Sequence, residues 1–230
     1  MNPNQPVAAS VALAGSIDWS KLDLQSLIEV INQGKVGGPL TTWLKEKSWE
    51  ATVEGGIQKR TLNPWKTIQV GGIVPKELIK RIAKEYSLGD WAKDLMGKPA
   101  FTVAEKKQPT DLVILTPRDL GFTEMPRTDE FMTKEFCAEW SAKHLAGYAI
   151  ELCSPEDGPQ LRLQYDDQPN GEVLWMAMER ITDSDGDPSV FYVERYGDGR
   201  RWLDGRYALP GHQWRLVSRV VFRLRKFTQS

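Results

Sequence analysis

This chain of 230 residues lacks the residue patterns that mark the common enzyme classes. The motifs GxGxxG, GxxxxGK[ST], GxSxG and HExxH are all missing from the sequence, so nothing indicates a phosphate-binding loop, a nucleophile elbow or a zinc-protease helix. Carboxylates are plentiful, but no feature selects a pair for glycoside hydrolysis. We therefore expect a binding protein rather than an enzyme, with no catalytic site and no cofactor.

Cysteine and histidine are scarce, with two residues of each. Cys137 and Cys153 form neither a CxxC site nor a disulfide framework, and we expect both to be small buried hydrophobes. His144 follows Cys137 by seven residues on an expected helix, which separates them by about 10 Å along the axis. That separation is too large for a nucleophile–base pair. His144 falls at the expected helix end, where a cation can pair with the helix dipole.

Apolar runs of membrane-spanning length are also missing. The apolar stretch at residues 7–15 is short and has no basic segment before it, so we do not interpret it as a signal peptide. We expect residues 1–17 to form a flexible tail, and we expect the protein to be cytoplasmic with no membrane partner.

Lysine is absent between Lys143 and Lys226, so arginine carries nearly all the positive charge near the C-terminus. Residues 195–226 contain eight Arg and one Lys against two Asp, a net charge of +7, whereas the whole chain carries −1. Arginine makes planar, bidentate and stacking contacts that lysine does not. This segment is therefore either a solvated sheet face or a patch for anions, carboxylates or aromatic partners.

The first part of the chain favours helices. We expect residues 18–101 to form a mainly helical N-terminal module, with helices at 18–33, 40–49, 75–86 and 88–96 and an extended or hairpin segment at 53–72. Residues 102–110 have few apolar side chains and contain Pro109. We interpret them as a linker between two domains.

Residues 111–230 have the pattern of an α+β domain. A strand is expected at 111–116 and a helix at 128–145, with Thr128 or Asp129 as its N-cap. Short antiparallel strands are expected at 148–153, 160–165, 172–181, 190–194 and 217–224, with turn-forming residues between them. The predicted fold is thus a helical region followed by a compact α+β binding domain.

One turn resembles a calcium loop. Asp183, Asp185 and Asp187 alternate, and Glu194 stands at the twelfth position. However, Pro188 occupies the sixth position, where such a loop needs glycine, and a strand-like segment follows. We favour a hairpin turn with exposed acids, and calcium binding is the alternative.

The last forty residues are unusually rich in Tyr, Trp, Arg, His and Gly. Aromatic and arginine side chains carry most of the binding energy at protein interfaces. Gly199-Arg-Arg-Trp202 opens this segment and Val221-Phe222-Arg223-Leu224 closes it. These two elements resemble the end of the C-type-lectin-like domain in variable proteins of diversity-generating retroelements. Val221 stands where that family has glycine. The remainder of the chain resembles bacterial proteins of unknown function.

The resemblance implies a buried framework and an exposed set of contact residues. The framework would comprise Val190, Val193, Trp202, Val220, Phe222 and Leu224. The contact residues would be Tyr196, Asp204, Arg206, Tyr207, His212, Gln213 and Arg215. It also implies that a retroelement diversifies such positions, and that the ligand is a protein or a surface glycan.

A nucleic-acid-associated protein is the alternative function. The net charge of +7 among interleaved aromatic residues is suited to phosphate contacts and base stacking. The overall acidity and the lack of a helix-turn-helix or zinc signature count against it. The sequence does not determine the oligomeric state.

Overall fold

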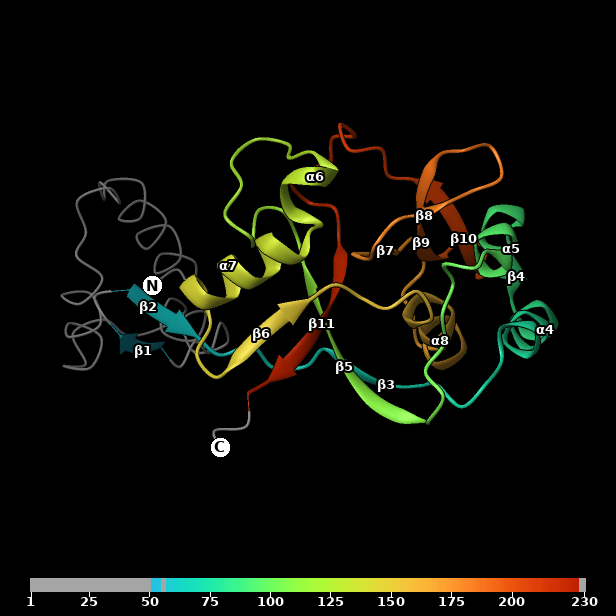
Figure 1. Ribbon diagram of the computed structural model, residues 1–230, viewed down its shortest axis with the longest axis horizontal. Coiled ribbons are helices and arrows are strands. Elements are labelled where there is room, and N and C mark those ends of the chain that lie inside the picture. The colour runs from blue at the N-terminus through green and yellow to red at the C-terminus, as the bar shows by residue number, and fades with distance from the viewer. Residues whose placement is uncertain (1–50, 55–56, 228–230) are drawn as a thin grey trace, which may run out of the picture. The chain divides into compact units, whose positions relative to one another are not determined.

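A computed structural model describes residues 51–54 and 57–227, and residues 50–230 form one compact unit with mixed helix and strand content (Figure 1). The expected tail at 1–17 and the expected helices at 18–33 and 40–49 lie outside the described residues.

The elements are short. The strands are β1 (Ala51–Glu54), β2 (Ile57–Arg60), β3 (Lys66–Val70), β4 (Ser87–Leu88), β5 (Gln108–Leu115), β6 (Tyr148–Glu151), β7 (Val173–Met176), β8 (Ile181–Thr182), β9 (Pro188–Arg195), β10 (Arg201–Tyr207) and β11 (Val220–Lys226). The helices are α4 (Pro75–Glu85), α5 (Asp90–Gly97), α6 (Thr128–Phe131), α7 (Lys134–His144) and α8 (Asp157–Gln164).

One curled sheet organises the unit. Its strand order is β3-β5-β11-β7-β9-β10-β4, with β6 pairing with β11 and β8 with β9, while β1 and β2 form a separate hairpin. Most pairs are antiparallel, as expected, but β7 runs parallel to β11 and β4 runs parallel to β10. Strands that are far apart in the sequence therefore lie side by side, and the sheet curls into a half-barrel.

The helices begin and end where the local sequence allows. Pro75 occupies the first turn of α4, where its missing N–H costs nothing, and Leu78 and Ile82 face the core. In α7, the hydroxyl of Thr133 accepts a hydrogen bond from the Phe136 amide at 3.1 Å and caps the N-terminus. The predicted helix at 75–86 is confirmed.

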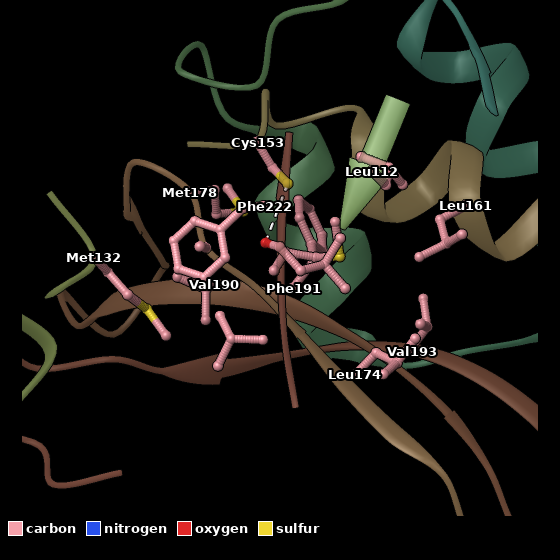
Figure 2. Close-up of a cluster of buried hydrophobic side chains, with 14 of the residues drawn as sticks. Leu112, Met132, Cys153, Leu161, Leu174, Met178, Val190, Phe191, Val193 and Phe222 are labelled. Carbon is pink, nitrogen blue, oxygen red and sulfur yellow. Dashed lines mark hydrogen bonds between the residues drawn. The ribbon is translucent and has the colours of Figure 1, made fainter. Parts of the chain in front are cut away.

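The hydrophobic core lies on both sides of the sheet. Figure 2 shows Val190 in the same cluster as Met132 and Phe222, and Phe191 together with Leu161 and Leu112. Val190 and Phe191 are adjacent in β9, so their side chains point to opposite faces. Both are fully buried, which shows that β9 is covered on both faces at its beginning.

The structure has no domain boundary at 102–110, where the sequence predicted one. β3 and β4 belong to the same sheet as the C-terminal strands, so the segment 66–101 is part of this unit and not a separate helical module. The amides of Gly71 and Ala104 both donate to the buried carboxylate of Glu156, at 2.7 and 2.8 Å. Residues 102–107 connect α5 to β5 and are tied to the domain rather than being a linker.

Two further expectations are wrong. Residues 160–165 lie mostly in α8 instead of forming a strand, because the segment from Asp157 to Arg162 is enclosed on all sides and gives no amphipathic signal. The single helix expected at 128–145 is two helices, since the extended backbone of Thr133 ends one and caps the next. No helix within the described residues has the length and apolar character of a membrane span.

Candidate functional site

The most distinctive surface lies on β7, β9 and β10. In these antiparallel strands, Trp175 pairs with Tyr192, Glu194 pairs with Trp202, and Tyr192 also pairs with Asp204. Paired residues point to the same face of a sheet. We call this side of the three strands the open face, and we define it by Trp175, Tyr192, Glu194, Trp202 and Arg206.

The opposite side of these strands is packed against helices. A Cβ added to Gly158 of α8 would lie 3.0 Å from the Phe191 Cβ, and one added to Gly205 would lie 3.1 Å from the Trp91 Cβ of α5. Phe191, Val193 and Leu203 are fully buried there. The helices therefore hold the three strands rigidly from behind.

The open face carries a row of aromatic rings. Tyr192 lies 4.9 Å from Trp175, and Trp175 lies 5.2 Å from Trp214, measured between ring centroids. Nearer the β9–β10 turn, Tyr196 and Trp202 meet edge to face at 5.8 Å. Tyr192, Trp175 and Trp202 are half-buried, and 37% of Tyr196 is exposed. Half-buried aromatic rings on a supported sheet are suited to contact with a ligand.

Glu194 places a carboxylate among these rings. Burial raises its pKa, and a hydrogen bond from Tyr196 opposes that rise. Burial also raises the pKa of Tyr192 to about 12, with the negative charges of Asp204 and Glu194 adding to the effect. No cation forms an ion pair with Glu194 among the residues that the structure describes.

Asp204, a predicted contact residue, is half-buried and has a structural role. Its Oδ1 accepts hydrogen bonds from the amides of Ala92, at 3.2 Å, and Gly205, at 2.8 Å. A Cβ on Gly89 would overlap its carboxylate, so the close approach to the start of α5 requires glycine there. Asp204 thus ties β10 to α5 through the free amides at the helix N-terminus.

Arg206 is part of the open face, and His212 lies beside it. The His212 ring is 5.1 Å from Trp214, which continues the aromatic row. Burial lowers the pKa of His212, and the positive charge of Arg206 lowers it further. Arg206 and Tyr196 stand near the two ends of β10, so the row between them covers roughly 20 Å.

Of the other predicted contact residues, Tyr207 lies beside Arg206, whereas Gln213 and Arg215 lie elsewhere. Tyr207, 49% exposed, lies beside Arg206, whose guanidinium carbon is 5.8 Å from the Tyr207 ring, and both line one small pocket with Tyr192. Gln213 forms an isolated bridge with Arg127, and Arg215 lies in the loop before β11. The structure therefore brings Tyr196, Asp204, Arg206, Tyr207 and His212 to one surface and leaves Gln213 and Arg215 outside it.

Five of the nine positive side chains in residues 195–226 are paired with acids. The pairs are Arg200–Asp198, Arg201–Asp166, Arg219–Glu172, Arg223–Asp157 and Arg225–Glu151. The Asp157 pair is bidentate, with N–O distances of 2.6 and 2.7 Å, and Asp157 is buried. Much of the positive charge of residues 195–226, which was expected to contact a partner, is therefore neutralised within the fold.

The acidic turn at 183–187 is a hairpin turn between β8 and β9. Oδ1 of Asp183 accepts hydrogen bonds from the amides of Asp185 and Asp187, and Oδ2 accepts one from the Ser189 hydroxyl. The hairpin turn is confirmed, but Asp183 is buried and holds the turn together, contrary to the expectation of exposed acids. The described part of the chain contains no group of three His, Cys, Asp or Glu side chains suited to a metal ion.

Sequence reasoning missed Trp175, Tyr192 and Glu194, and it assigned Trp202 to the buried framework. The alternation in Val190-Phe-Tyr192-Val-Glu194 contains the signal, since it places tyrosine and glutamate on the side opposite Phe191. The other framework residues are buried as expected.

Comparisons with known proteins give no family. No family model matches the chain, and searches of the curated proteins and of the solved structures give no significant match. The function is therefore argued from the site itself.

Proposed function

We propose that this protein is a ligand-binding protein and that the open face contacts the ligand. The observation that carries the proposal is the row of half-buried rings formed by Trp175, Tyr192, Tyr196 and Trp202 on a sheet packed from behind by α5 and α8. Rigid aromatic side chains supply contact area at a low cost in conformational entropy. The ligand class is a protein or a surface glycan.

Selection experiments with matched variants test the proposal. The full chain, a Tyr192→Ala/Trp202→Ala variant and a Phe227→Ala control would each be offered a displayed peptide library and a glycan array. Phe227 is also an exposed aromatic residue, at 49%, but it follows β11 and its amide donates to the Gly147 carbonyl, away from the open face. We expect ligands retained by the full chain and the control to bind the double variant at least about thirtyfold more weakly. Ligands that bind all three proteins equally would contradict the proposal.

The resemblance to retroelement variable proteins supports a finer proposal. On this proposal the domain is C-type-lectin-like, and exposed positions such as Arg206, Tyr207, His212 and Gln213 are diversified. Their exposure supports it, since surface substitutions away from special features change stability little. Comparison of the 3′ end of the gene with a nearby near-identical copy tests it. Differences scattered outside adenine positions would exclude adenine-directed diversification.

Nucleic-acid binding is the second candidate, favoured by the net charge of +7 in residues 195–226. The five internal ion pairs weaken it, because paired arginines contribute less to counterion release. Titration of a single-stranded oligonucleotide at low and moderate salt separates the two candidates. A steep loss of affinity with salt would favour nucleic acid over the aromatic contact surface.

A further inference from the structure

A polar hollow lies where the corner between α4 and β4 meets the turn between β9 and β10. It measures about 750 Å³, and the side chains that matter for its chemistry are Lys84, Tyr86, Ser87, Asp166, Arg200 and Arg201. β4 pairs with the beginning of β10, so two segments far apart in the sequence form its walls. It lies beyond the aromatic row, and Arg200 borders both, since its guanidinium is 5.6 Å from the Tyr196 ring.

A buried positive charge lies behind this hollow. Arg162 is fully buried, and its guanidinium carbon is 5.1 Å from the ring of Tyr86. Its Nη atoms donate to two neutral oxygens, Gln168 Oε1 and the Tyr165 carbonyl, each at 2.5 Å. Its Nε has no hydrogen-bond partner. Burial lowers the pKa of Arg162 to about 10, which still leaves it charged at neutral pH.

No carboxylate within the described residues forms an ion pair with Arg162 or with Lys84. Asp166 attracts Arg162 but does not pair with it. Charge interactions are stronger where water is excluded, so the buried charge of Arg162 makes the potential behind Tyr86 positive. Lys84 is exposed at the rim and adds to that potential.

The Asp166 carboxylate marks the hydrogen-bond donors that an anion in this hollow would use. Its Oδ1 accepts a hydrogen bond from the Tyr86 hydroxyl at 2.7 Å and pairs with the Arg201 guanidinium. Its side chain is 68% exposed, so a competing anion reaches the same donors from solvent. Arg200 pairs with Asp198, which is also largely exposed. Glu85 is a further acid at the rim, so the excess of positive charge comes from Arg162 and Lys84.

We propose that this hollow binds an oxyanion, the phosphate or sulfate group of a ligand. The guanidinium groups of Arg200 and Arg201 supply paired donors, Lys84 supplies charge at the rim, and the hydroxyl groups of Tyr86 and Ser87 complete the polar lining. An incoming oxyanion takes the place of the Asp166 carboxylate on Arg201 and Tyr86. This site adjoins the open face through Arg200, whose guanidinium also lies near the Tyr196 and Trp202 rings, and its other residues lie outside that face.

Titration of the full chain with small anions tests this inference. Inorganic phosphate, inorganic sulfate, a sugar phosphate and a sulfated sugar would be added while amide chemical shifts are recorded by NMR. We expect saturable shifts at residues around Tyr86 and Arg200. Preference for the sugar phosphate or for the sulfated sugar identifies the source of the group. The proposal would be overturned if the amide shifts did not saturate with any of the four anions.

Variants make the test specific. Arg200→Gln and Lys84→Gln should each weaken binding about five- to tenfold. Arg215→Gln is the matched control, because Arg215 is an exposed arginine in the loop before β11, and it should change nothing. Asp166→Asn keeps an acceptor for Tyr86 and removes the competing charge, so it should tighten binding severalfold. Equal weakening by the Arg215 variant, or weakening by a folded Asp166 variant, would overturn the proposal.

Discussion

At the residue scale, Glu194 shows that the open face is not optimised for stability. The folded protein holds this carboxylate between aromatic rings, where burial raises its pKa. A raised pKa means that the charged form is disfavoured in the folded state relative to the unfolded chain. Natural proteins retain such costs most often where a residue serves binding. The carboxylate is therefore better explained by contact with a ligand than by the fold.

Glu194→Gln should reveal this cost as a dependence of stability on pH. Between the ordinary pKa and the raised one, the folded protein keeps a proton that the unfolded chain has lost, so wild-type stability falls as pH rises. Glutamine does not titrate. We expect the variant to gain stability relative to wild type as pH rises through the ordinary titration range of a glutamate and to keep that gain at higher pH, by roughly 0.5 kcal/mol or less. Urea unfolding at several pH values measures the gain, and a variant that loses stability at high pH would contradict it.

Asp204 has the opposite character, since its hydrogen bonds to Ala92 and Gly205 serve the fold. Asp204→Ala leaves the amide at the start of α5 without its acceptor and should lower the free energy of unfolding by about 1 kcal/mol. Asp204→Asn keeps an acceptor oxygen and serves as the control. Urea unfolding of both variants measures the difference. Equal midpoints for wild type and Asp204→Ala would show that the contact is dispensable.

At the scale of elements, alternation and turn signals predicted many of the strands, whereas β10 and α8 were missed. Strand β9 was found because apolar and turn residues bound it, and helix α4 because Leu78 and Ile82 repeat with helical spacing. Helix α8 has Arg162 and Gln160 buried beside Leu161, so polarity does not vary around it. Its environment comes from β3, β9 and the loop at 102–107, which local sequence does not specify.

The same limit applies to the candidate site. Tyr196 and His212 could be predicted because aromatic and polar residues in loops are usually exposed, and Arg206 because an arginine in a short strand rarely faces the core. Trp175 could not be joined to them, because it stands in a separate strand whose pairing with Tyr192 is set by tertiary contacts. The hollow lined by Tyr86 could not be predicted from the sequence either, since β4 and β10 meet only in the folded sheet.

The packing of α8 on the sheet gives a prediction for Gly158. An alanine Cβ there would lie 3.0 Å from the Phe191 Cβ and 3.1 Å from the Met176 Cγ, closer than normal contacts allow. We expect Gly158→Ala to lower the free energy of unfolding by about 1–3 kcal/mol through overpacking. Gly211→Ala is the control, because no heavy atom lies within 4 Å of its added Cβ. Thermal unfolding compares the two variants. Equal effects would show that α8 can shift to make room for the added methyl group.

At the scale of the whole molecule, the sheet makes residues 66–227 interdependent. β3 forms one end of the sheet by pairing with β5, and β4 forms the other by pairing with β10. Both strands precede residue 102, so the sheet is completed at each end by the part of the chain that composition assigned to another module. Apolar side chains of α4 and α5 are buried in the same core, Leu78 and Leu95 among them.

A chain that begins at residue 111 should therefore not fold alone. It would lose β3, β4, α4 and α5, and it would leave Glu156 without the Gly71 and Ala104 amides that it accepts from. Leu112 and Leu203, fully buried in the intact unit, would lose contacts that keep them from water, at a cost of about 1.5–3 kcal/mol for each side chain exposed. We expect residues 50–230 to give a dispersed NMR spectrum and a cooperative thermal transition, and residues 111–230 to give neither. A dispersed spectrum from the shorter chain would restore the boundary at 102–110, because it would show that the C-terminal strands need no partner from the first half.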